Sequence, residues 1–428
     1  MAVAAGNALS RASRAAGLGS GSVVGGHAVL AVDPRALAHL ALGRQVMLVS
    51  GTNGKTTTTK LLARAATAAT GTEVVTNLQG ANLTTGLAAA LASGPLGAPA
   101  VLEVDEAWLG HVLPELRPAV LVLLNLSRDQ LDRNNEVRHV AQRWRDACQR
   151  LEAGAVVVAN ADDPLVDWAA LAAPSVVWVG AGLGWKNDAT GCPACAGPVS
   201  FGDGGDWKCD GCSLARPGLD MWLEGEGREA CAVAGDRLGG PARYTLGLAL
   251  PGRCNEANAA TVLAAVLASG WAGGPAVVAM RQVDEVAGRY ARAEHAGTRA
   301  RLLLAKNPAG WAEVFDMVGA SGGPVVVAIN ARTADGHDPS WLWDVPFERL
   351  AGRRVVATGE RCLDLSVRLH YAGVEHAVER GLLAALAVAG PGDADVVANY
   401  TALHQLLAVL PARGQGTRGR GRGTRGAR

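Results

Sequence analysis

Residues 45–57 read QVMLVSGTNGKTT, a short apolar run followed by a glycine turn and by residues that suit the start of a helix. The apolar run at 45–50 predicts a buried β-strand, and a helix is predicted to follow from Lys55. Gly51 and Gly54 let backbone N–H groups approach phosphate oxygens, and the helix N-terminus adds a favourable dipole. This strand, loop and helix predict an α/β domain with a phosphate-binding site at the end of its first strand.

The same strand signal recurs along the chain, separated by segments long enough for helices. It is found at 101–104, 119–126, 155–160, 301–305, 325–330, 354–359 and 395–400. Such alternation predicts parallel sheets with helices on both faces. The expected organisation is a lead-in at 1–44, a first α/β domain at 45–290 with an insertion at about 185–218, a second, Rossmann-like α/β domain at 291–412, and an Arg/Gly tail at 413–428. The tail is expected to be disordered because its composition cannot form a core.

Each residue of the glycine turn is a candidate for phosphate binding: Gly51, Thr52, Asn53, Gly54, Lys55, Thr56 and Thr57. In loops of this kind the lysine reaches the terminal phosphates, and the hydroxyl group after it binds Mg²⁺. We therefore expect these roles for Lys55 and Thr56. The general pattern has a glycine where this chain has Val49, so the loop is a variant. A plain glycine turn that caps a helix is the alternative interpretation.

Four cysteines are closely spaced in the expected insertion. Cys192, Cys195, Cys209 and Cys212 form two C-x₂-C pairs in a segment rich in Gly, Asp and Pro, which is too polar to build its own core. Two such pairs can supply the four thiolates of a tetrahedral Zn²⁺ site that has no position left for water. We expect a zinc ribbon with a structural role, and another metal or a redox role is the alternative.

Composition excludes several classes of function. The formal charge of +1 gives no general field for nucleic acid, and no apolar run approaches the roughly 20 residues of a membrane helix. The first residues lack the continuous apolar core of a signal peptide. We expect a cytoplasmic protein. A zinc ribbon with an Arg/Gly tail could bind RNA, but the cysteine pairs have few basic residues near them, so no nucleic-acid ligand is expected.

An ordered set of short motifs resembles the Mur ligases and the folylpolyglutamate synthases. They are GTNGKTT at 51–57, TNL at 76–78 with Asn82, EVDE at 103–106, NLSRDQLDR at 125–133, NADDP at 160–164, GRCNEAN at 252–258, GR at 288–289 and KNP at 306–308. Any one of them is a weak signal, whereas the ordered set is specific. The resemblance implies that ATP activates a carboxylate as an acyl phosphate, which an amine then attacks.

The resemblance also implies roles for individual residues. Glu103 would bind Mg²⁺ together with Thr56, and Asn255, Asn258 and Arg289 would lie near the nucleotide. The chain has Gln130 where many Mur ligases have a metal-binding histidine, and no lysine matches their carbamylated lysine. One Mg²⁺ is therefore expected rather than two.

The cysteine pairs and the C-terminal motifs narrow the resemblance to the MurT family. These motifs are LAKNPAGW at 304–311, ADGHDPSWLWD at 334–344 and NYTAL at 399–403. The family resemblance implies amidation of the D-glutamate α-carboxyl of lipid II at the inner membrane face, with ammonia from a GatD-type glutaminase that docks on the second domain. It further implies an aspartate that orients the catalytic histidine of that partner. Asp335 and Asp338 are favoured over Asp344, with no choice between the first two.

Two other functions remain as alternatives. A stand-alone amide ligase of the folylpolyglutamate synthase type would add an amino acid rather than ammonia, but it would not need the cysteine pairs or the C-terminal motifs. A nucleic-acid-binding zinc-ribbon protein is the less favoured alternative.

Overall fold

The computed structural model describes residues 3, 6, 10, 22–77, 81–129, 137–319 and 321–410. The chain forms two compact units, Met1–Val286 and Ala287–Arg428, and each is described by itself. Among the described residues, no helix is both long and apolar enough to cross a bilayer.

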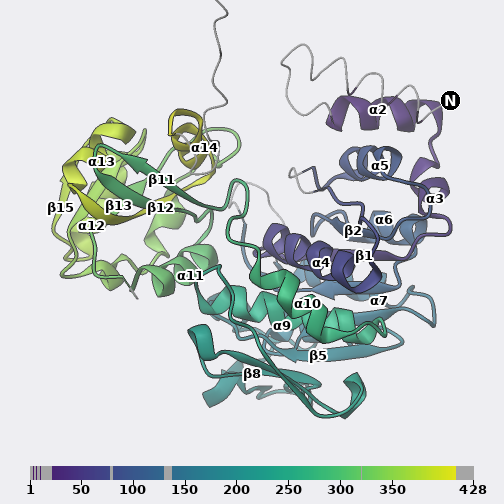
Figure 1. Ribbon diagram of the computed structural model, residues 1–428. Helices are drawn as coiled ribbons and strands as arrows, with labels where there is room; N and C mark the ends of the chain where they lie inside the picture. The colour runs from purple at the N-terminus through teal and green to yellow at the C-terminus, as the bar shows by residue number, and fades with distance from the viewer. Residues whose placement is uncertain are drawn as a thin grey trace, which may run out of the picture. The chain divides into compact units, whose positions relative to one another are not determined.

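The first unit is built on an eight-stranded sheet with the order β10-β9-β8-β5-β4-β3-β1-β2 (Figure 1). Its strands are β1 (Val46–Ser50), β2 (Ala100–Glu103), β3 (Val120–Leu123), β4 (Val156–Asn160), β5 (Val176–Gly180), β8 (Met221–Glu224), β9 (Cys231–Ala234) and β10 (Ala242–Thr245). Neighbouring strands from β2 to β8 are parallel, whereas β8, β9 and β10 form an antiparallel meander. The predicted α/β fold is confirmed, and the meander extends the parallel sheet.

Helices cover both faces of this sheet. They are α2 (Ser22–Val32), α3 (Ala36–Ala41), α4 (Lys55–Thr70), α5 (Thr84–Ser93), α6 (Leu109–Leu116), α7 (Val137–Cys148), α8 (Pro164–Ala170), α9 (Arg253–Ala268) and α10 (Gly273–Arg281). One face packs against α4 and α9, and the other belongs to the core that includes α3, α5, α6, α7 and α8. Burial on both faces explains why the central strands are continuous apolar runs in the sequence.

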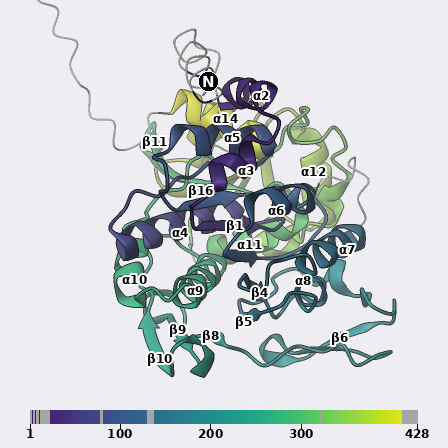
Figure 2. The same ribbon diagram turned by 90° about the vertical axis from the view of Figure 1, so that its right-hand side faces the viewer.

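The cysteine-rich insertion forms a small antiparallel hairpin of β6 (Val199–Phe201) and β7 (Trp207–Cys209), which Figure 2 shows beside the sheet of the first unit. Trp207 is buried, and its indole Nε1 donates to the carbonyl oxygen of Ala161 at 2.8 Å. Arg216 forms an ion pair with the buried carboxylate of Asp162 at 2.5 Å. These contacts attach the insertion to the segment that follows β4.

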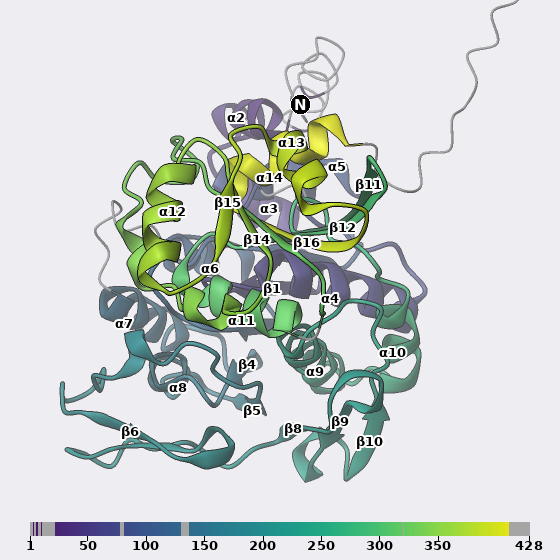
Figure 3. The ribbon, with the colours of Figure 1, turned by 90° about the vertical axis from the view of Figure 1, so that its left-hand side faces the viewer.

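The second unit contains a six-stranded sheet with the order β11-β12-β16-β13-β14-β15 (Figure 3). Its strands are β11 (Tyr290–His295), β12 (Thr298–Leu304), β13 (Val325–Ala328), β14 (Val355–Thr358), β15 (His376–Val378) and β16 (Gly392–Ala398), and its helices are α11 (Pro308–Gly319), α12 (Cys362–Tyr371), α13 (Leu382–Ala389) and α14 (Tyr400–Val409). All pairings are parallel except that of β11 with β12. This arrangement confirms a second α/β unit.

Candidate functional site

The glycine turn joins the buried strand β1 to helix α4, and its backbone requires glycine at two positions. Gly54 lies in the left-handed region with φ of 82° and is the residue before Lys55, where α4 begins. A Cβ atom at Gly51 would lie 2.9 Å from the Cβ of Leu124, closer than carbon atoms normally approach. The loop is therefore fixed against the end of β3 with its N–H groups at a helix N-terminus, which favours anion binding.

The segment after β3 holds the loop through hydrogen bonds. The Thr52 N–H donates to the Asn125 carbonyl at 2.9 Å, and the Asn53 N–H donates to Asn125 Oδ1 at 2.9 Å. The Asn125 side chain donates back to the Asn53 carbonyl, and the Ser127 N–H donates to Thr52 Oγ1 at 3.0 Å. The loop and the motif that begins at Asn125 thus form one rigid element.

Two oxygen ligands suited to a hard cation meet beside the loop. The Thr56 hydroxyl donates to Glu103 Oε2 at 2.8 Å, and both side chains are buried. Glu103 lies at the end of β2, where the Asn77 side chain bonds to both its N–H and its carbonyl at 2.8 Å. Mg²⁺ prefers hydroxyl, carboxylate and phosphate oxygens, so this donor set fits the ion.

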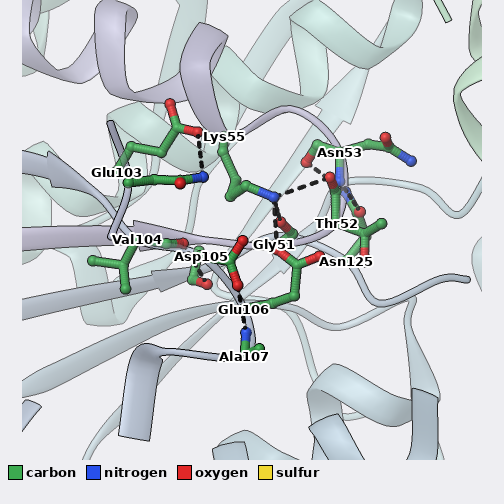
Figure 4. A network of polar contacts seen from close by, with 12 residues as sticks. Gly51, Thr52, Asn53, Lys55, Glu103, Val104, Asp105, Glu106, Ala107 and Asn125 are labelled. Atoms are coloured by element: carbon green, nitrogen blue, oxygen red, sulfur yellow. Dashed lines mark hydrogen bonds and ion pairs between the residues drawn. The ribbon is translucent and has the colours of Figure 1, made fainter. Parts of the chain in front are cut away.

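The Lys55 ammonium lies within the loop and is almost completely buried, with a side-chain exposure of 4%. It donates to Glu106 Oε2 at 2.7 Å, to the Thr52 carbonyl at 3.1 Å and to the Gly51 carbonyl (Figure 4). Burial lowers the pKa of Lys55, but the carboxylates of Glu106 and Glu103 raise it more strongly, so the net pKa is above its ordinary value. Lys55 therefore stays cationic at neutral pH.

Of the candidate nucleotide residues on α9, Asn258 lies next to the loop. A Cβ atom on Gly54 would lie 3.0 Å from Asn258 Oδ1, so α9 approaches the loop directly. The Asn255 side chain lies one turn earlier and donates to the Pro251 carbonyl at 2.6 Å. Arg289 belongs to the second unit and directly precedes β11.

The four clustered cysteines are brought together as their spacing predicts. The sulfur atoms of Cys192, Cys195, Cys209 and Cys212 all lie within 4.8 Å of one another. Two of these distances are 3.7 Å and 3.4 Å, close to the edge of about 3.8 Å that Zn–S bonds of 2.3 Å give in a tetrahedron. The N–H groups of Gly197 and Gly211 point to Cys195 and Cys209 Sγ, as expected for thiolate acceptors. The cluster can hold one metal ion.

The three candidate aspartates of the second unit differ in their surroundings. Asp335 is buried, and its carboxylate accepts from the N–H of Thr401 at 2.9 Å and from the hydroxyl of Thr401. Asp338 is exposed and accepts from the N–H and hydroxyl of Ser340 at 2.8 Å and 2.9 Å. These bonds hold the pKa of the Asp338 carboxyl below its ordinary value. Asp344 is also exposed.

Some sequence-based expectations concern residues outside the described part of the chain. These are Leu78, the QLDR portion of the motif at 125–133 with Gln130, the start of the lead-in, and the tail at 413–428.

Each of the two units matches the model of a known protein domain family. The Mur ligase middle domain matches residues 49–187, and the MurT ligase C-terminal domain matches residues 304–403. The MurT subunit of the lipid II isoglutaminyl synthase (glutamine-hydrolyzing) of Streptococcus pneumoniae is 30% identical, over 83% of this chain and 83% of that protein. The chain belongs to the MurT family of Mur ligases. The corresponding subunit of Staphylococcus aureus is 28% identical to this MurT-family chain, over 94% of the chain and 95% of that protein.

Solved structures show the same fold as this MurT-family chain. A pseudomurein peptide ligase type C from Methanothermus fervidus superimposes with a TM-score of 0.65 at 18% identity, covering 84% of this chain and 77% of that one. MurF ligase from Thermotoga maritima, solved in complex with ADP, has a TM-score of 0.62 at 18% identity, covering 87% and 81%. At this level of identity the likeness concerns the fold.

Asp163 of the NADDP segment and Asp167 of helix α8 are two interacting buried carboxyl groups of this MurT-family chain. Asp163 caps α8 and accepts from the Leu126 N–H at 2.9 Å, which connects it to the end of β3. Asp167 is fully buried, and neither of its carboxyl oxygens has a hydrogen-bond partner in the structure as described. Burial raises the pKa of Asp163 to about 6, and burial together with Asp163 raises that of Asp167 to about 8. Asp167 is therefore protonated at neutral pH.

We expect the Asp167 carboxyl to make the protein less stable as the pH rises from about 6 to about 8. The folded chain retains a proton that the unfolded chain releases, so the free energy of unfolding falls by up to about 1.4 kcal/mol per pH unit. Asp167→Asn removes the titration and should flatten the dependence, measured by chemical denaturation across this range. Equal slopes for the Asp167→Asn variant and the parent would contradict the assignment.

Proposed function

We propose that this chain is the ATP-using subunit of a lipid II isoglutaminyl synthase. It would convert the α-carboxyl of D-glutamate in the lipid II stem peptide into the amide of D-isoglutamine. The observation that carries the proposal is the match over most of both chains to subunits of that name. The phosphate loop beside a buried threonine–glutamate pair supports it, because this geometry suits activation of a carboxylate by ATP.

In the first step, residues of the phosphate loop would bind ATP while its terminal phosphate is transferred to the substrate carboxylate. A carboxylate oxygen of the substrate attacks the γ-phosphorus of ATP, and ADP leaves. Both reactants are anionic, so catalysis depends on positioning and on neutralisation of charge. The N–H groups of residues 51–57 and the Lys55 ammonium would hold the phosphates. Thr56 and Glu103 would hold Mg²⁺, which would shield the negative charge of the phosphates. Asn255 and Asn258 of α9 would complete the part of the nucleotide site that the first unit supplies.

Ammonia would perform the second step. Its lone pair attacks the acyl carbon, phosphate leaves, and a proton is lost from nitrogen to give the amide. Glutamine is a poor nitrogen donor until a thiolate has displaced its amide nitrogen as ammonia. The Cys148 thiol of this chain is buried, and burial raises its pKa to about 12, so it is unsuited to that task. We propose a separate GatD-type glutaminase as the partner of this cytoplasmic subunit at the inner membrane face, because the relatives are named as subunits of a glutamine-hydrolyzing synthase.

Asp338 is the residue that we propose to orient the catalytic histidine of the partner. A carboxylate in that role must lie at the surface and have free acceptor capacity. The exposed Asp338 is held by two hydrogen bonds from Ser340, which leaves further lone pairs available. The buried carboxylate of Asp335 instead accepts hydrogen bonds from the N–H and the hydroxyl of Thr401 in its own unit. We propose that Asp335 holds the loop at 331–340 in place through its hydrogen bonds to Thr401.

The decisive test combines the purified chain with a GatD-type glutaminase, lipid II, ATP, Mg²⁺ and either glutamine or ammonium chloride. We expect ADP release and a product in which an amino group replaces one hydroxyl group, as read by mass spectrometry. Addition of a whole amino acid would favour the stand-alone amide ligase instead. A chain that leaves lipid II unchanged with both nitrogen sources would contradict the proposed function.

We also propose that the four-cysteine cluster binds structural zinc, since its geometry matches a closed tetrahedral site. Elemental analysis of the purified protein should find about one zinc per chain. Cys209→Ser should lose the metal and make the 191–215 segment sensitive to proteolysis, because its own apolar core consists of few residues. Cys231→Ser, outside the cluster, should keep the metal. A metal-free parent protein with a protease-resistant insertion would contradict the proposal.

A further inference from the structure

The Lys55 ammonium has three N–H donors, and each already has an acceptor. Two are the carbonyl oxygens of Gly51 and Thr52, and the third is the carboxylate of Glu106. An ammonium group can donate three hydrogen bonds and accept none. A phosphate oxygen can therefore bond to Lys55 only by taking the place of one of these acceptors.

The three acceptors differ in their freedom to move. The two carbonyl oxygens belong to the loop backbone, which Asn125 and Ser127 hold in place. Glu106 is also fixed through its backbone, because its carbonyl oxygen accepts from the indole Nε1 of Trp144 at 2.9 Å. Its carboxylate, however, lies at the end of a side chain with rotatable bonds and is 14% exposed, compared with 4% for Lys55. Glu106 is thus the acceptor that can leave.

Electrostatic repulsion also identifies Glu106 as the acceptor that a phosphate would displace. A buried ammonium is costly without a counter-ion, and Glu106 supplies one at 2.7 Å. A polyphosphate would bring negative charge to the same ammonium, and two anions cannot both stay next to it without repulsion. Figure 4 shows the position next to the Lys55 ammonium that the carboxylate of Glu106 occupies. A nucleotide phosphate would need that same position.

We propose that Glu106 is a positioning residue that holds Lys55 in place with its carboxylate and competes with the terminal phosphates of the nucleotide for it. This inference rests on the proposed function only in taking ATP as the ligand of the loop. By linkage, the ion pair and the nucleotide each weaken the other. Glu106 would keep the buried lysine paired between turnovers and would help to release the product nucleotide.

The test measures nucleotide binding by calorimetry without lipid II or the glutaminase, using ADP, a non-hydrolysable ATP analogue and AMP. Glu106→Gln keeps the shape of the side chain and removes its charge. It should tighten binding of ADP and of the analogue by about tenfold, a usual size for coupled binding, and leave AMP unchanged. Thermal unfolding without nucleotide should shift to lower temperature, because Lys55 loses its counter-ion. Glu73→Gln removes the same charge from an exposed residue and should change neither quantity.

A second variant and a second condition separate the possible outcomes. Glu106→Asp keeps the charge but shortens the reach, so its affinity should lie between those of the parent and Glu106→Gln. Each titration is repeated without Mg²⁺, where the tightening should persist. If Glu106→Gln instead weakens binding, and does so only with Mg²⁺, Glu106 is a metal ligand and the competition model is wrong. Unchanged affinity in both variants also overturns it. Failure of the parent protein to bind any nucleotide would count against the proposed function itself.

Discussion

Lys55→Ala is expected to reduce lipid II-dependent ADP release by roughly a hundred- to a thousandfold, the usual loss when one charged or hydrogen-bonding group at a developing charge is removed. The ammonium is buried in the loop, and the nearby carboxylates keep it cationic. No water molecule can supply the same fixed positive charge to the transferred phosphate. Turnover is measured by coupled detection of ADP with the complete two-subunit enzyme.

The variant also leaves Glu106 as a buried carboxylate without its ammonium partner, so a loss of activity could reflect a damaged fold. The double variant Lys55→Ala/Glu106→Gln removes both charges and should regain the thermal stability of the parent without regaining turnover. Arg64→Ala removes a positive charge from the exposed side of the same helix and serves as the matched control. Near-parental turnover in Lys55→Ala would exclude the proposed role of the loop.

The part of the fold that the sequence predicts best is the part in which local and tertiary signals agree. Residues 46–50 of the run predicted at 45–50 form β1 and are buried on both faces, so their continuous apolar character is a direct result of their position. The helix predicted from Lys55 begins at that residue, since Gly54 adopts the left-handed conformation just before it. The clustering of the four cysteines was equally predictable, because two C-x₂-C pairs at this spacing are typical of segments that bring four thiol groups together.

The meander formed by β8, β9 and β10 was not predicted. These strands are short, and β10 alternates half-buried with exposed residues, such as Arg243, that pair with charges rather than with a core. Strands β11 and β15 are edge strands of the second sheet with similarly mixed burial. Strands of this kind are defined by their neighbours, so a single sequence gives no continuous apolar run to mark them.

Within the candidate site, the residue types were predictable, but their pairings were not. Glu106 stands in the EVDE motif, yet its ion pair with Lys55 depends on how the turn after β2 meets the loop after β1. Asn77 lies in a quoted motif, but its double hydrogen bond to the backbone of Glu103 requires the folded sheet. The choice between Asp335 and Asp338 likewise depended on burial, which two acidic residues three positions apart do not reveal in sequence.

Asp338→Asn is expected to lower glutamine-dependent amidation by up to about 10⁴-fold, as when a triad loses the carboxylate that fixes its histidine tautomer. Amidation with free ammonia at high concentration should continue at the parental rate, because the phosphate loop lies in the other unit and is unchanged. Asparagine keeps the size of aspartate and can still accept from Ser340, so the local turn should survive. Both activities are measured on the same preparation of the complex.

Asp335→Asn and Asp344→Asn serve as comparisons within the same loop. Asp335→Asn should mainly lower the melting temperature of the chain, because an amide replaces a carboxylate that accepts from both the N–H and the hydroxyl of Thr401. Asp344→Asn should retain both activities. If Asp335→Asn or Asp344→Asn alone removed glutamine use, the carboxylate that serves the partner would be that one and not Asp338. If Asp338→Asn lost both activities equally, the loop would serve the ligase reaction, since a defect in ammonia production cannot slow a reaction that is supplied with ammonia.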